Sequence, residues 1–559
     1  MLKLVQIIWC GLRGSPSRAL RGLYWYLAGK RVRGLNLIKS AAARSPSYYQ
    51  LWIAICEPRL IESYCLADAA APRLAVVATI LQADSNPQGA ERTRGALRAA
   101  FGTDLMLVDG CDPETLSSLL SRGAWLLPIM AGDLVSSKLS GVLASAVTRH
   151  PAARILFWDE DQFDQSFRSA PWVKAEWDED LFLSRDGLTS SAAYLIGREL
   201  AGTVEGEIGQ LLLAAIISTR EFGTVAHIPL ILSHRAPAGC IDELAERARM
   251  LTQNWPGHPE FVPGPDGRDV LETIWPVATW PAVSIIIPTR DRLDLLQTCI
   301  AGISKLEYPG CVELIIADNS SEEPETLAYF NEFSNGIGKV IDCAGPFNFS
   351  TIVNRAATQA GGQLLCLLNN DVEPLDGTWL ERLVRQAVRP GVGAVGAMLL
   401  YPDGSIQHAG VALGVGGAAG HIYRSLRPEL RGNGSLHCAT RRVSIVTAAC
   451  LLIQRDHFFE VGGFDEAAFA VAFNDVDFCL RLEAIGLRNI YVAEARLIHA
   501  ESKSRGNDML ASNIARYRSE LGRLQHRWGT QRTIDPWHSP LIGRAAEDFV
   551  LEFDARSRE

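Results

Sequence analysis

A short apolar run that ends in amides and carboxylates is the most chemically suggestive part of the sequence. Residues 364–373 read LLCLLNNDVE. The run has the length of a buried strand and is too short to span a bilayer. Open α/β sheets bind their ligands at the carboxyl ends of such strands. Asp371 therefore lies where a hard oxygen ligand could hold Mg²⁺ or Mn²⁺, and such an ion could hold a diphosphate.

Two further acids follow apolar runs in the same way. Asp291 comes after the run at 283–288, and Asp318 comes directly after the run at 312–317. Carboxyl ends of parallel strands meet at one edge of a sheet, so we expect both acids near Asp371. Asp318 could accept a hydrogen bond from a base or a ribose. Any one of these acids could instead be a turn or cap residue, but three at strand ends favour a shared site.

A second group of acids precedes a helical pattern. Residues 473–477 read FNDVD, and the apolar positions after them predict the start of a helix. Asp475 and Asp477 could stabilise the helix dipole there, or Asp475 could act as a general base toward an acceptor hydroxyl. Arg481 would then orient these acids. His499 closes a later apolar run, either as a satisfied polar residue or as a further metal ligand.

The elements that must position these residues alternate between strand and helix. Residues 283–288 predict a strand, 293–303 carry helical spacing, and 312–317 predict a second strand, which favours a parallel α/β sheet. The first half repeats this order more faintly, so an internal duplication is predicted. Its strand patterns fall at 74–80, 105–108, 124–127 and 154–157, and they lead to Asp109, Asp133 and the acids 159–161.

Composition excludes several classes of protein. At 559 residues the chain is too long for a single core, and 48% hydrophobic with 21% charged residues describes a folded protein. The net charge of -9 argues against a nucleic-acid partner. The 12 cysteines form no C-x-x-C pair, which favours a reducing, cytoplasmic compartment without zinc or disulfide frameworks. No apolar run is long enough for a transmembrane helix.

The first fifty-six residues differ from this average. They contain no acid, since the first is Glu57, and aromatic residues are interleaved with their basic residues. Such a segment could lie on an anionic membrane face, or it could be a helical cap whose basic residues are solvated. It lacks the pattern of a signal peptide. The basic residues are Lys3, Arg13, Arg18, Arg21, Lys30, Arg31, Arg33, Lys39 and Arg44.

A glycine run at 414–420, GVGGAAG, imitates a dinucleotide phosphate loop. It lies in the middle of the second half and lacks a suitable acid about 20 residues further on. A nicotinamide or flavin site is therefore a weak third interpretation.

The motifs of the second half, taken in order, resemble family 2 glycosyltransferases of the GT-A fold. The likeness covers about 283–506 and is closest to rhamnosyltransferase-like proteins of bacterial O-antigen and capsule assembly. The matching segments are 283–292 (VSIIIPTRDR), 316–320 (IADNS), 346–350 (PFNFS), 368–371 (LNND), 401–404 (YPDG), 407–410 (QHAG), 447–450 (TAAC), 462–465 (GGFD), 474–477 (NDVD), and 499–502 (HAES) with 504–506 (SRG).

The resemblance implies an inverting transfer from a nucleoside-diphosphate sugar, with rhamnose among the candidate sugars, to a saccharide or lipid-linked saccharide. Asp475 matches the catalytic base, and Asp371 and His499 match positions for Mg²⁺ or Mn²⁺. The D-x-D motif of the family has Asn at its first position here, and Glu373 just outside it is a weaker metal candidate. The expected nucleotide-sugar-binding residues are Thr289, Asp291, Asp318, Asn369, Asn370, Asp477 and Arg481.

The first half resembles the partner domain of tandem members of this group, through FWDED at 157–161, PWVK at 171–174 and HIP at 227–229. Its metal motif position reads MAG at 130–132, so the metal-binding carboxylates are expected to be missing. Its base motif position reads GQLL at 209–212. We therefore expect a degenerate domain with a scaffold or acceptor-binding role. Its acids at 159–161 are more readily explained as paired or solvated carboxylates than as metal ligands.

The sequence thus predicts an α/β protein with two GT-A-like domains. The segments are a basic helical region at 1–70, a degenerate domain at 71–236, a Pro/Gly-rich linker at 237–281, a catalytic domain at 282–506 and a helical tail at 507–559. The expected location is the cytoplasm, with peripheral contact at the inner membrane face. An alternative function is a catalytically silent assembly protein that keeps both folds.

Overall fold

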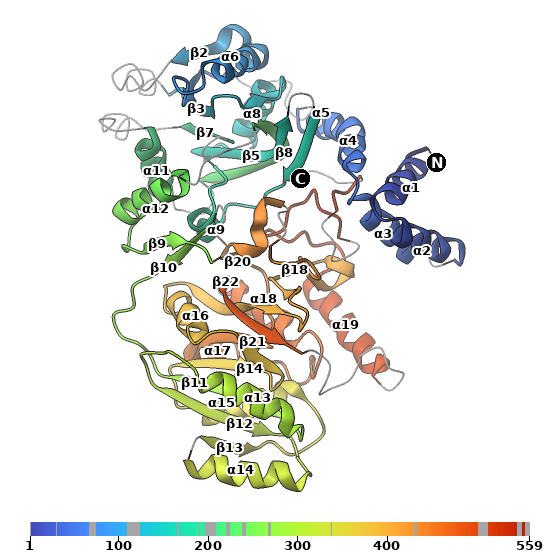
Figure 1. Cartoon of the computed structure of the whole chain (residues 1–559), viewed down its shortest axis with the longest axis vertical. Coiled ribbons are helices and arrows are strands. Elements are labelled where there is room, and N and C mark those ends of the chain that lie inside the picture. The colour runs from blue at the N-terminus through green and yellow to red at the C-terminus, as the bar shows by residue number, and fades with distance from the viewer. Residues whose placement is uncertain are drawn as a thin grey trace.

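A computed structural model describes most of the chain. The residues it describes are 2–29, 31–65, 74–108, 123–164, 167–188, 191–195, 208–219, 224–236, 242–265, 270–336, 338–429, 433–500, 513–544 and 550–553. Asp109 and the predicted motif at 501–506 lie outside these residues. The predicted fold class is confirmed, since two α/β domains are arranged along the long axis of the molecule (Figure 1).

The first domain is built on one sheet and its helices. Among the described residues this sheet has eight strands in the order β2-β1-β3-β7-β5-β8-β4, with β6 paired to β5. The strands are β1 Val76–Leu81, β2 Leu105–Val108, β3 Trp125–Met130, β4 Leu134–Val135, β5 Ile155–Asp164, β6 Phe167–Trp172, β7 Ala192–Leu195 and β8 Val225–Arg235. The helices are α6 Pro87–Phe101, α8 Leu139–Arg149, α9 Glu179–Ser184 and α11 Ile208–Ser218.

The second domain has a larger sheet. In the described part of the chain it has ten strands in the order β13-β12-β11-β14-β21-β16-β22-β15, with β17 on β16 and β20 on β22, and its strands β13 and β20 have no counterpart in the first sheet. The strands are β11 Val283–Thr289, β12 Val312–Asp318, β13 Lys339–Asp342, β14 Leu364–Leu368, β15 Val372–Pro374, β16 Val392–Leu400, β17 Ile406–His408, β20 Arg441–Val443, β21 Cys450–Gln454 and β22 Arg488–His499. The helices are α13 Leu293–Ile303, α14 Pro324–Gly336, α15 Phe349–Gln359, α16 Trp379–Ala387, α17 Arg455–Glu460, α18 Asn474–Ala484 and α19 Ile514–Trp528.

The two sheets repeat one topology. The order β12-β11-β14-β21-β16-β22-β15 follows the first-domain order β2-β1-β3-β7-β5-β8-β4 strand for strand. The direction of pairing, parallel or antiparallel, also agrees at each of these neighbouring pairs. The predicted internal duplication is therefore present in the fold, and these seven strands of one sheet each have a counterpart in the other.

The prediction of a parallel sheet needs a correction. β11 pairs in parallel with β12 and β14, as expected, but β14 pairs antiparallel with β21. A strand that is buried on both faces shows a continuous apolar run whichever way it points, so the sequence pattern does not carry its direction.

Strand β14 lies in the middle of the second sheet, and all five of its residues are buried. Leu365 and Leu367 pack into a core shared with α15 and α18, whereas Leu364, Cys366 and Leu368 pack into a core shared with α13 and α16. The alternation follows from the two-residue period of a strand. The metal motif after Leu368 is thus attached to a strand that is fixed on both faces.

The segment predicted as a linker is more ordered than expected. It contains α12 Asp242–Asn254 and a hairpin of β9 Glu260–Pro263 and β10 Leu271–Ile274. Leu251 and Trp255 are fully buried in a core with first-domain residues. Arg389 then joins the domains, since its Nη1 lies 2.5 Å from Asp180 Oδ1 in a buried ion pair. The predicted boundaries remain our working division of the chain.

The first helices of the chain dock beside the first domain and the end of the chain. They are α1 Leu2–Gly14, α2 Pro16–Leu27, α3 Arg31–Ala42, α4 Pro46–Ile55 and α5 Glu57–Cys65. Lys39 pairs with Glu552 at 2.7 Å, and the Tyr48 hydroxyl donates to the Leu551 carbonyl at 2.8 Å. None of the described helices combines the length and the apolar character needed to cross a membrane.

The glycine run at 414–420 has no part in a dinucleotide site. It connects β18 Val411–Leu413 to β19 Ala419–His421 as a tight hairpin, closed by a bond from the Gly414 amide to the Ala418 carbonyl. A phosphate loop would require a strand followed by a helix at this point. The weak third interpretation is therefore not supported by the fold.

Candidate active site

The metal motif forms the three-residue turn between β14 and β15. The Asn369 amide donates to the Ala449 carbonyl at 3.0 Å, which ties the turn to the start of β21. The Asn370 side chain donates to Thr289 Oγ1 at 2.8 Å, which ties it to the end of β11. Asn369 and Asn370, two of the predicted nucleotide-sugar residues, thus hold the shape of the turn and leave Asp371 as its acid.

Asp371 and His499 face each other, as predicted for a metal pair. Asp371 precedes β15, and Val372 pairs with His499 across the sheet. Asp371 Oδ1 lies 3.1 Å from His499 Nε2, and Asn369 Nδ2 lies 3.4 Å from the same nitrogen. Both Asp371 and His499 are buried. Apart from this ion-pair contact, Asp371 Oδ1 has no hydrogen-bond partner.

The tautomer of His499 follows from Gln407. Gln407 Oε1 lies 2.6 Å from His499 Nδ1, and the Gln407 amide nitrogen donates to the His499 carbonyl. These two bonds fix the orientation of the Gln407 amide, so Nδ1 donates to Gln407 and Nε2 is the ring nitrogen that faces Asp371. A proton on Nε2 or a metal ion could bridge this nitrogen and the carboxylate oxygen.

These residues therefore fit a divalent cation, but only in part. A carboxylate oxygen and an imidazole nitrogen suit Mn²⁺ or Mg²⁺ with a preference for the softer ion. The described residues contain no group of three or more His, Cys, Asp and Glu side chains that could hold a metal ion. The remaining ligands would have to be oxygens of a bound substrate or water. Glu373, the weaker candidate, lies on β15 opposite Ile498 and is exposed.

Asp291 and Asp318 shape the loops beside this turn. The Asp291 carboxylate accepts the amides of Glu322 and Glu323, at 2.8 and 2.9 Å, and so caps the chain before α14. Asp318 accepts the Ser321 amide and hydroxyl at 3.0 and 2.6 Å. Thr289 pairs with Asp318 across β11 and β12, so the predicted residues do lie at one edge.

The backbone at this edge is held in uncommon conformations. Asp291 and Arg292 have φ of +49° and +53°, and Ser320 has φ of +62°. Residues other than glycine seldom adopt positive φ, and such positions cluster at functional sites. Phe473, two residues before Asp475, has φ of +61°. Strained loops thus flank both the predicted nucleotide residues and the predicted base.

Asp475 lies in the first turn of α18. It contacts the segment just before β21, which the metal turn also contacts. Its Oδ2 accepts the Ala448 amide at 3.2 Å, and its Oδ1 accepts the Val476 amide at 2.9 Å. Residue 449 in turn holds Asn369. The segment before β21 therefore connects the predicted base to the predicted metal turn, and Asp475 remains half-buried.

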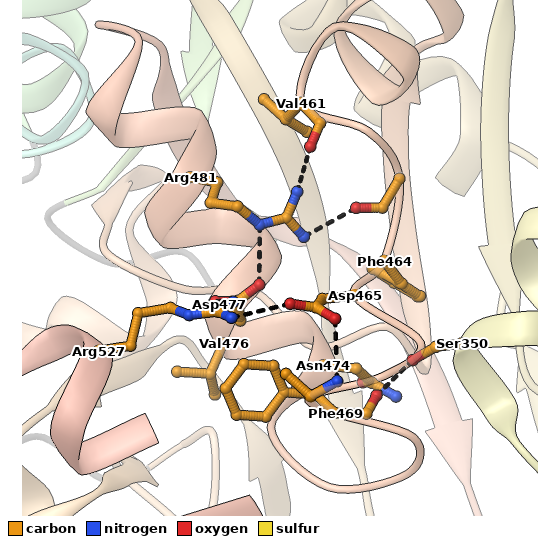
Figure 2. Close-up of polar contacts among 12 residues, drawn as sticks. Ser350, Val461, Phe464, Asp465, Phe469, Asn474, Val476, Asp477, Arg481 and Arg527 are labelled. Carbon is orange, nitrogen blue, oxygen red and sulfur yellow. Dashed lines mark hydrogen bonds and ion pairs between the residues drawn. The ribbon is translucent and has the colours of Figure 1, made fainter. Parts of the chain in front are cut away.

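Asp477 and Arg481 have contacts that change the role we predicted for them (Figure 2). Asp477 is fully buried and accepts Arg481 Nε at 2.8 Å. It also accepts Arg527 Nη1 and Trp528 Nε1, at 2.8 and 2.9 Å. Arg481 also donates to the carbonyls of Val461 and Gly463. A direct contact of Asp477 with a nucleotide sugar would require these bonds to break. We therefore assign both residues to positioning α18, which carries Asp475.

Sequence reasoning missed Gln407. It belongs to the QHAG segment that carried the resemblance, but an isolated glutamine gives no sign of its role. Only the pairing of β17 with β16 brings it against His499.

The first domain has a counterpart of the metal turn. β3 and β4 are joined by three residues, as β14 and β15 are, so Asp133 takes the place of Asp371. Leu134 pairs with His234 as Val372 pairs with His499. We expected the carboxylates of this motif to be missing, and that is wrong for one of them. The motif ends at Asp133, one residue beyond the three letters compared.

The surroundings of Asp133 differ from those of Asp371. Arg235 Nε lies 3.1 Å from Asp133 Oδ2, and the Ala236 amide donates to Oδ1 at 2.8 Å. His234 Nδ1 lies 2.7 Å from Asp161. Burial raises the pKa of Asp133 to about 6, although Arg235 acts against this. A guanidinium thus lies beside Asp133. It belongs to Arg235, the residue after His234, whereas the residue after His499 is Ala500.

The acids 159–161 are paired, which agrees with the interpretation we favoured. Asp161 accepts Arg168 Nε at 2.6 Å, and Asp159 lies 2.8 Å from His227 Nε2. Glu160 binds Lys174 at 3.0 Å. Burial opposes ionisation of Glu160, but Lys174 and Arg235 outweigh it and lower its pKa to about 2.

Fold and site together define an α/β protein with a candidate metal and anion site at the carboxyl edge of its second sheet. A family model described as glycosyl transferase family 2 matches residues 284–458, which include β11, β14 and the turn at Asp371. The second domain therefore matches glycosyltransferase family 2 over these residues.

Curated relatives extend over more of the chain. The protein y4gI of Sinorhizobium fredii (strain NBRC 101917 / NGR234) is 35% identical over 458 residues, covering 77% of this chain and 50% of that protein. The O-antigen biosynthesis protein RfbC of Myxococcus xanthus is 34% identical over 455 residues, covering 77% and 34%. An N-acetylglucosaminyl-diphospho-decaprenol L-rhamnosyltransferase of Mycobacterium tuberculosis (strain ATCC 25618 / H37Rv) is 27% identical over 266 residues, covering 44% and 83%. The chain thus spans half or less of the length of the first two relatives.

Proposed function

We propose that this chain is a metal-dependent, inverting glycosyltransferase. It moves a sugar from a nucleoside-diphosphate donor to a saccharide or lipid-linked saccharide in surface polysaccharide synthesis. The observation that carries the proposal is the buried pair Asp371 and His499, whose carboxylate oxygen and ring nitrogen Nε2 lie 3.1 Å apart. The match of residues 284–458 to glycosyltransferase family 2 and the relative named as an O-antigen biosynthesis protein support the same class of reaction.

Each part of the chemistry is assigned to named residues. Mg²⁺ or Mn²⁺ held by Asp371 and His499 would neutralise charge on the leaving diphosphate. Thr289, Asp291 and Asp318 form the edge where the nucleoside would lie. Asp475 takes the proton of the acceptor hydroxyl as that oxygen attacks the anomeric carbon. A single base on the acceptor side leads to inversion, because the hydroxyl attacks opposite the leaving group.

Thr289 and Asn370 have a supporting role in this scheme. The bond from Asn370 to Thr289 Oγ1 joins the metal turn to the end of β11, so the two sides of the donor site are held at a fixed separation. A preorganised site of this kind is needed because misplacement of about 1 Å can lower the rate about a hundredfold.

A donor screen tests the proposal. The purified chain is incubated with UDP-, GDP-, dTDP- and CMP-sugars and Mn²⁺, and nucleotide release is measured with and without saccharide acceptors. Rhamnose donors come first, because one relative is named an L-rhamnosyltransferase. Release with one donor that requires both Mn²⁺ and Asp475 supports the proposal.

Calorimetry distinguishes the proposed enzyme from the alternative, a catalytically silent assembly protein. Titration of nucleoside diphosphates with and without Mn²⁺ should show metal-dependent binding that Asp371→Asn abolishes. Absence of metal-dependent binding to the unmodified chain would favour the silent protein.

The location belongs to the same proposal. A lipid-linked acceptor at the cytoplasmic face of the membrane would suit a chain that associates with that surface. The face that could make the contact is described next.

A further inference from the structure

The most exposed large apolar side chains of the described residues lie on the first two helices. They belong to Val5 and Trp9 of α1, at 58% and 57% exposure, and to Leu20, Tyr24 and Leu27 of α2, at 57%, 65% and 76%. Other exposed apolar side chains in the described part of the chain stay at or below the 49% of Leu375. Isolated surface apolar residues are ordinary, but five on two neighbouring helices mark an interaction face.

Each set forms a stripe on the outer side of its helix. Val5 and Trp9 are four residues apart, and Leu20, Tyr24 and Leu27 follow the spacing of one helical face. The opposite faces hold small residues that allow close packing. A Cβ on Gly22 would lie 2.8 Å from Ile38 of α3, so α2 rests directly on that helix. The exposed apolar stripes therefore lie on the side of each helix that is not packed.

Basic residues accompany the stripes. Arg13 and Arg21 are exposed, and the Arg13 guanidinium lies 5.0 Å from the centre of the Trp9 ring. Across residues 1–56 the sequence has nine Lys and Arg and no acid, in a chain whose net charge is -9. A surface that combines apolar, aromatic and basic side chains is complementary to an anionic lipid surface, where headgroups are negative and the region beneath is apolar.

We propose that the outer faces of α1 and α2 dock on the surface of an anionic bilayer. Val5, Trp9, Leu20, Tyr24 and Leu27 enter the boundary between headgroups and acyl chains, and Arg13 and Arg21 lie among the anionic headgroups. These seven side chains form the contact surface, and its partner is an anionic lipid surface. This docking does not rest on the proposed glycosyl transfer, because it needs neither the metal turn nor Asp475.

Vesicle sedimentation of the full chain tests the docking face. The probes are vesicles of phosphatidylcholine alone and vesicles in which about one third of the lipid is anionic phosphatidylglycerol. Binding should occur to the anionic vesicles and weaken as salt is added. The variant Trp9→Ser/Tyr24→Ser/Leu27→Ser should lose about tenfold or more in partition, since these side chains supply the buried apolar area. Arg13→Gln/Arg21→Gln should lose roughly tenfold at low salt only.

A matched variant controls for the loss of apolar surface. Leu327→Ser/Leu375→Ser removes exposed apolar side chains of the second domain, at 42% and 49% exposure, and should bind vesicles as the unmodified chain does. Circular dichroism and thermal melting should show all variants folded, because every altered side chain is exposed. Nucleotide release in detergent-free buffer with a soluble acceptor should not change.

Two results would overturn the docking face. One is equal binding of the triple variant and the unmodified chain to anionic vesicles. The other is an oligomer, seen by light scattering, that the triple variant converts to a monomer while vesicle binding is absent throughout. That second result would assign the face to contact between copies of this chain.

Discussion

The two domains share one topology but differ in what surrounds the same two positions. Asp371 and His499 in the second domain correspond to Asp133 and His234 in the first. In the second domain the histidine is oriented by a neutral amide, and its Nε2 faces the carboxylate. In the first domain the histidine is bound by the acid Asp161, and the carboxylate is paired with a guanidinium.

We propose that the first domain keeps the fold without a metal site. Arg235 places a guanidinium 3.1 Å from the Asp133 carboxylate, where its positive charge would repel a cation. The predicted base motif position also differs, since the first domain has GQLL at 209–212, with Gln210 in the place of Asp475 in NDVD. The polar interior of the first domain contains buried ion pairs of acids with Lys174, Arg168 and histidines instead. Its scaffold or acceptor-binding role remains a proposal.

Removal of the acid from each metal turn should give the largest difference between the two domains. Asp371→Asn should lower the rate of nucleotide release about a thousandfold, because charge stabilisation of the leaving group is lost. Asp133→Asn should change that rate less than about twofold, since Arg235 already occupies its carboxylate. Initial rates at saturating donor measure both. A large loss from Asp133→Asn would give the first domain a catalytic role.

The base position gives the next largest effect. Asp475→Asn keeps the shape of the side chain and can keep one of its two bonds from backbone amides, but it removes the proton acceptor, so turnover should fall about a few hundredfold. The matched change Gln210→Asp places an acid at the first-domain position and should not raise turnover. Comparison of kcat with KM for the acceptor tests this, since loss of a base lowers kcat more than it changes KM. An unchanged kcat for Asp475→Asn would remove the residue from the mechanism.

Metal binding should distinguish the domains by stoichiometry. We expect one Mn²⁺ per chain in the presence of a nucleoside diphosphate, measured by calorimetry. His499→Ala should weaken that affinity about a hundredfold, and Gln407→Leu about tenfold, because Gln407 fixes the ring through Nδ1. His234→Ala serves as the matched control and should leave the affinity unchanged. Two equivalent ions per chain would contradict the comparison.

Substitution of Asp161 should have the smallest effect on catalysis. It should have a clear effect on stability. Its carboxylate binds the Tyr49 hydroxyl at 2.5 Å as well as Arg168, and it ties α4 to the first sheet. Asp161→Asn leaves the Arg168 charge without one of its buried partners and should destabilise the first domain by about 3 kcal/mol. Thermal melting should show a lower midpoint, with kcat within about twofold. A variant that melts normally would show that these ion pairs are not needed for the fold.

Much of the fold and site could be predicted from local patterns. The apolar runs at 283–288, 312–317 and 364–368 form β11, β12 and β14. They could be predicted because the length and burial of a strand follow from the types of consecutive residues. The position of Asp371 after such a run was likewise predictable. Strand direction was not, and the antiparallel β21 beside β14 has no mark in the sequence.

The roles of Asp477 and Arg481 show where local reasoning ends. Both lie in the segment that resembled a catalytic motif, and their types fit a binding role. Arg527 and Trp528, which bind Asp477, come from α19 some fifty residues later. Contacts across such separations depend on how α18 and α19 pack, so no spacing rule could have assigned them.

The sequence by itself determined the chemical types at the site: an acid after a buried strand, an acid at a helix start, and a histidine at a strand end. Tertiary structure decided which of them meet. The pairing of β15 with β22 brings Asp371 to His499, and β17 turns the ring by placing Gln407 against it. The same pairing in the first domain brings Arg235, in place of a histidine, within 3.1 Å of Asp133. Residue type is local, whereas the electrostatic environment of a side chain is set by neighbours distant in the sequence.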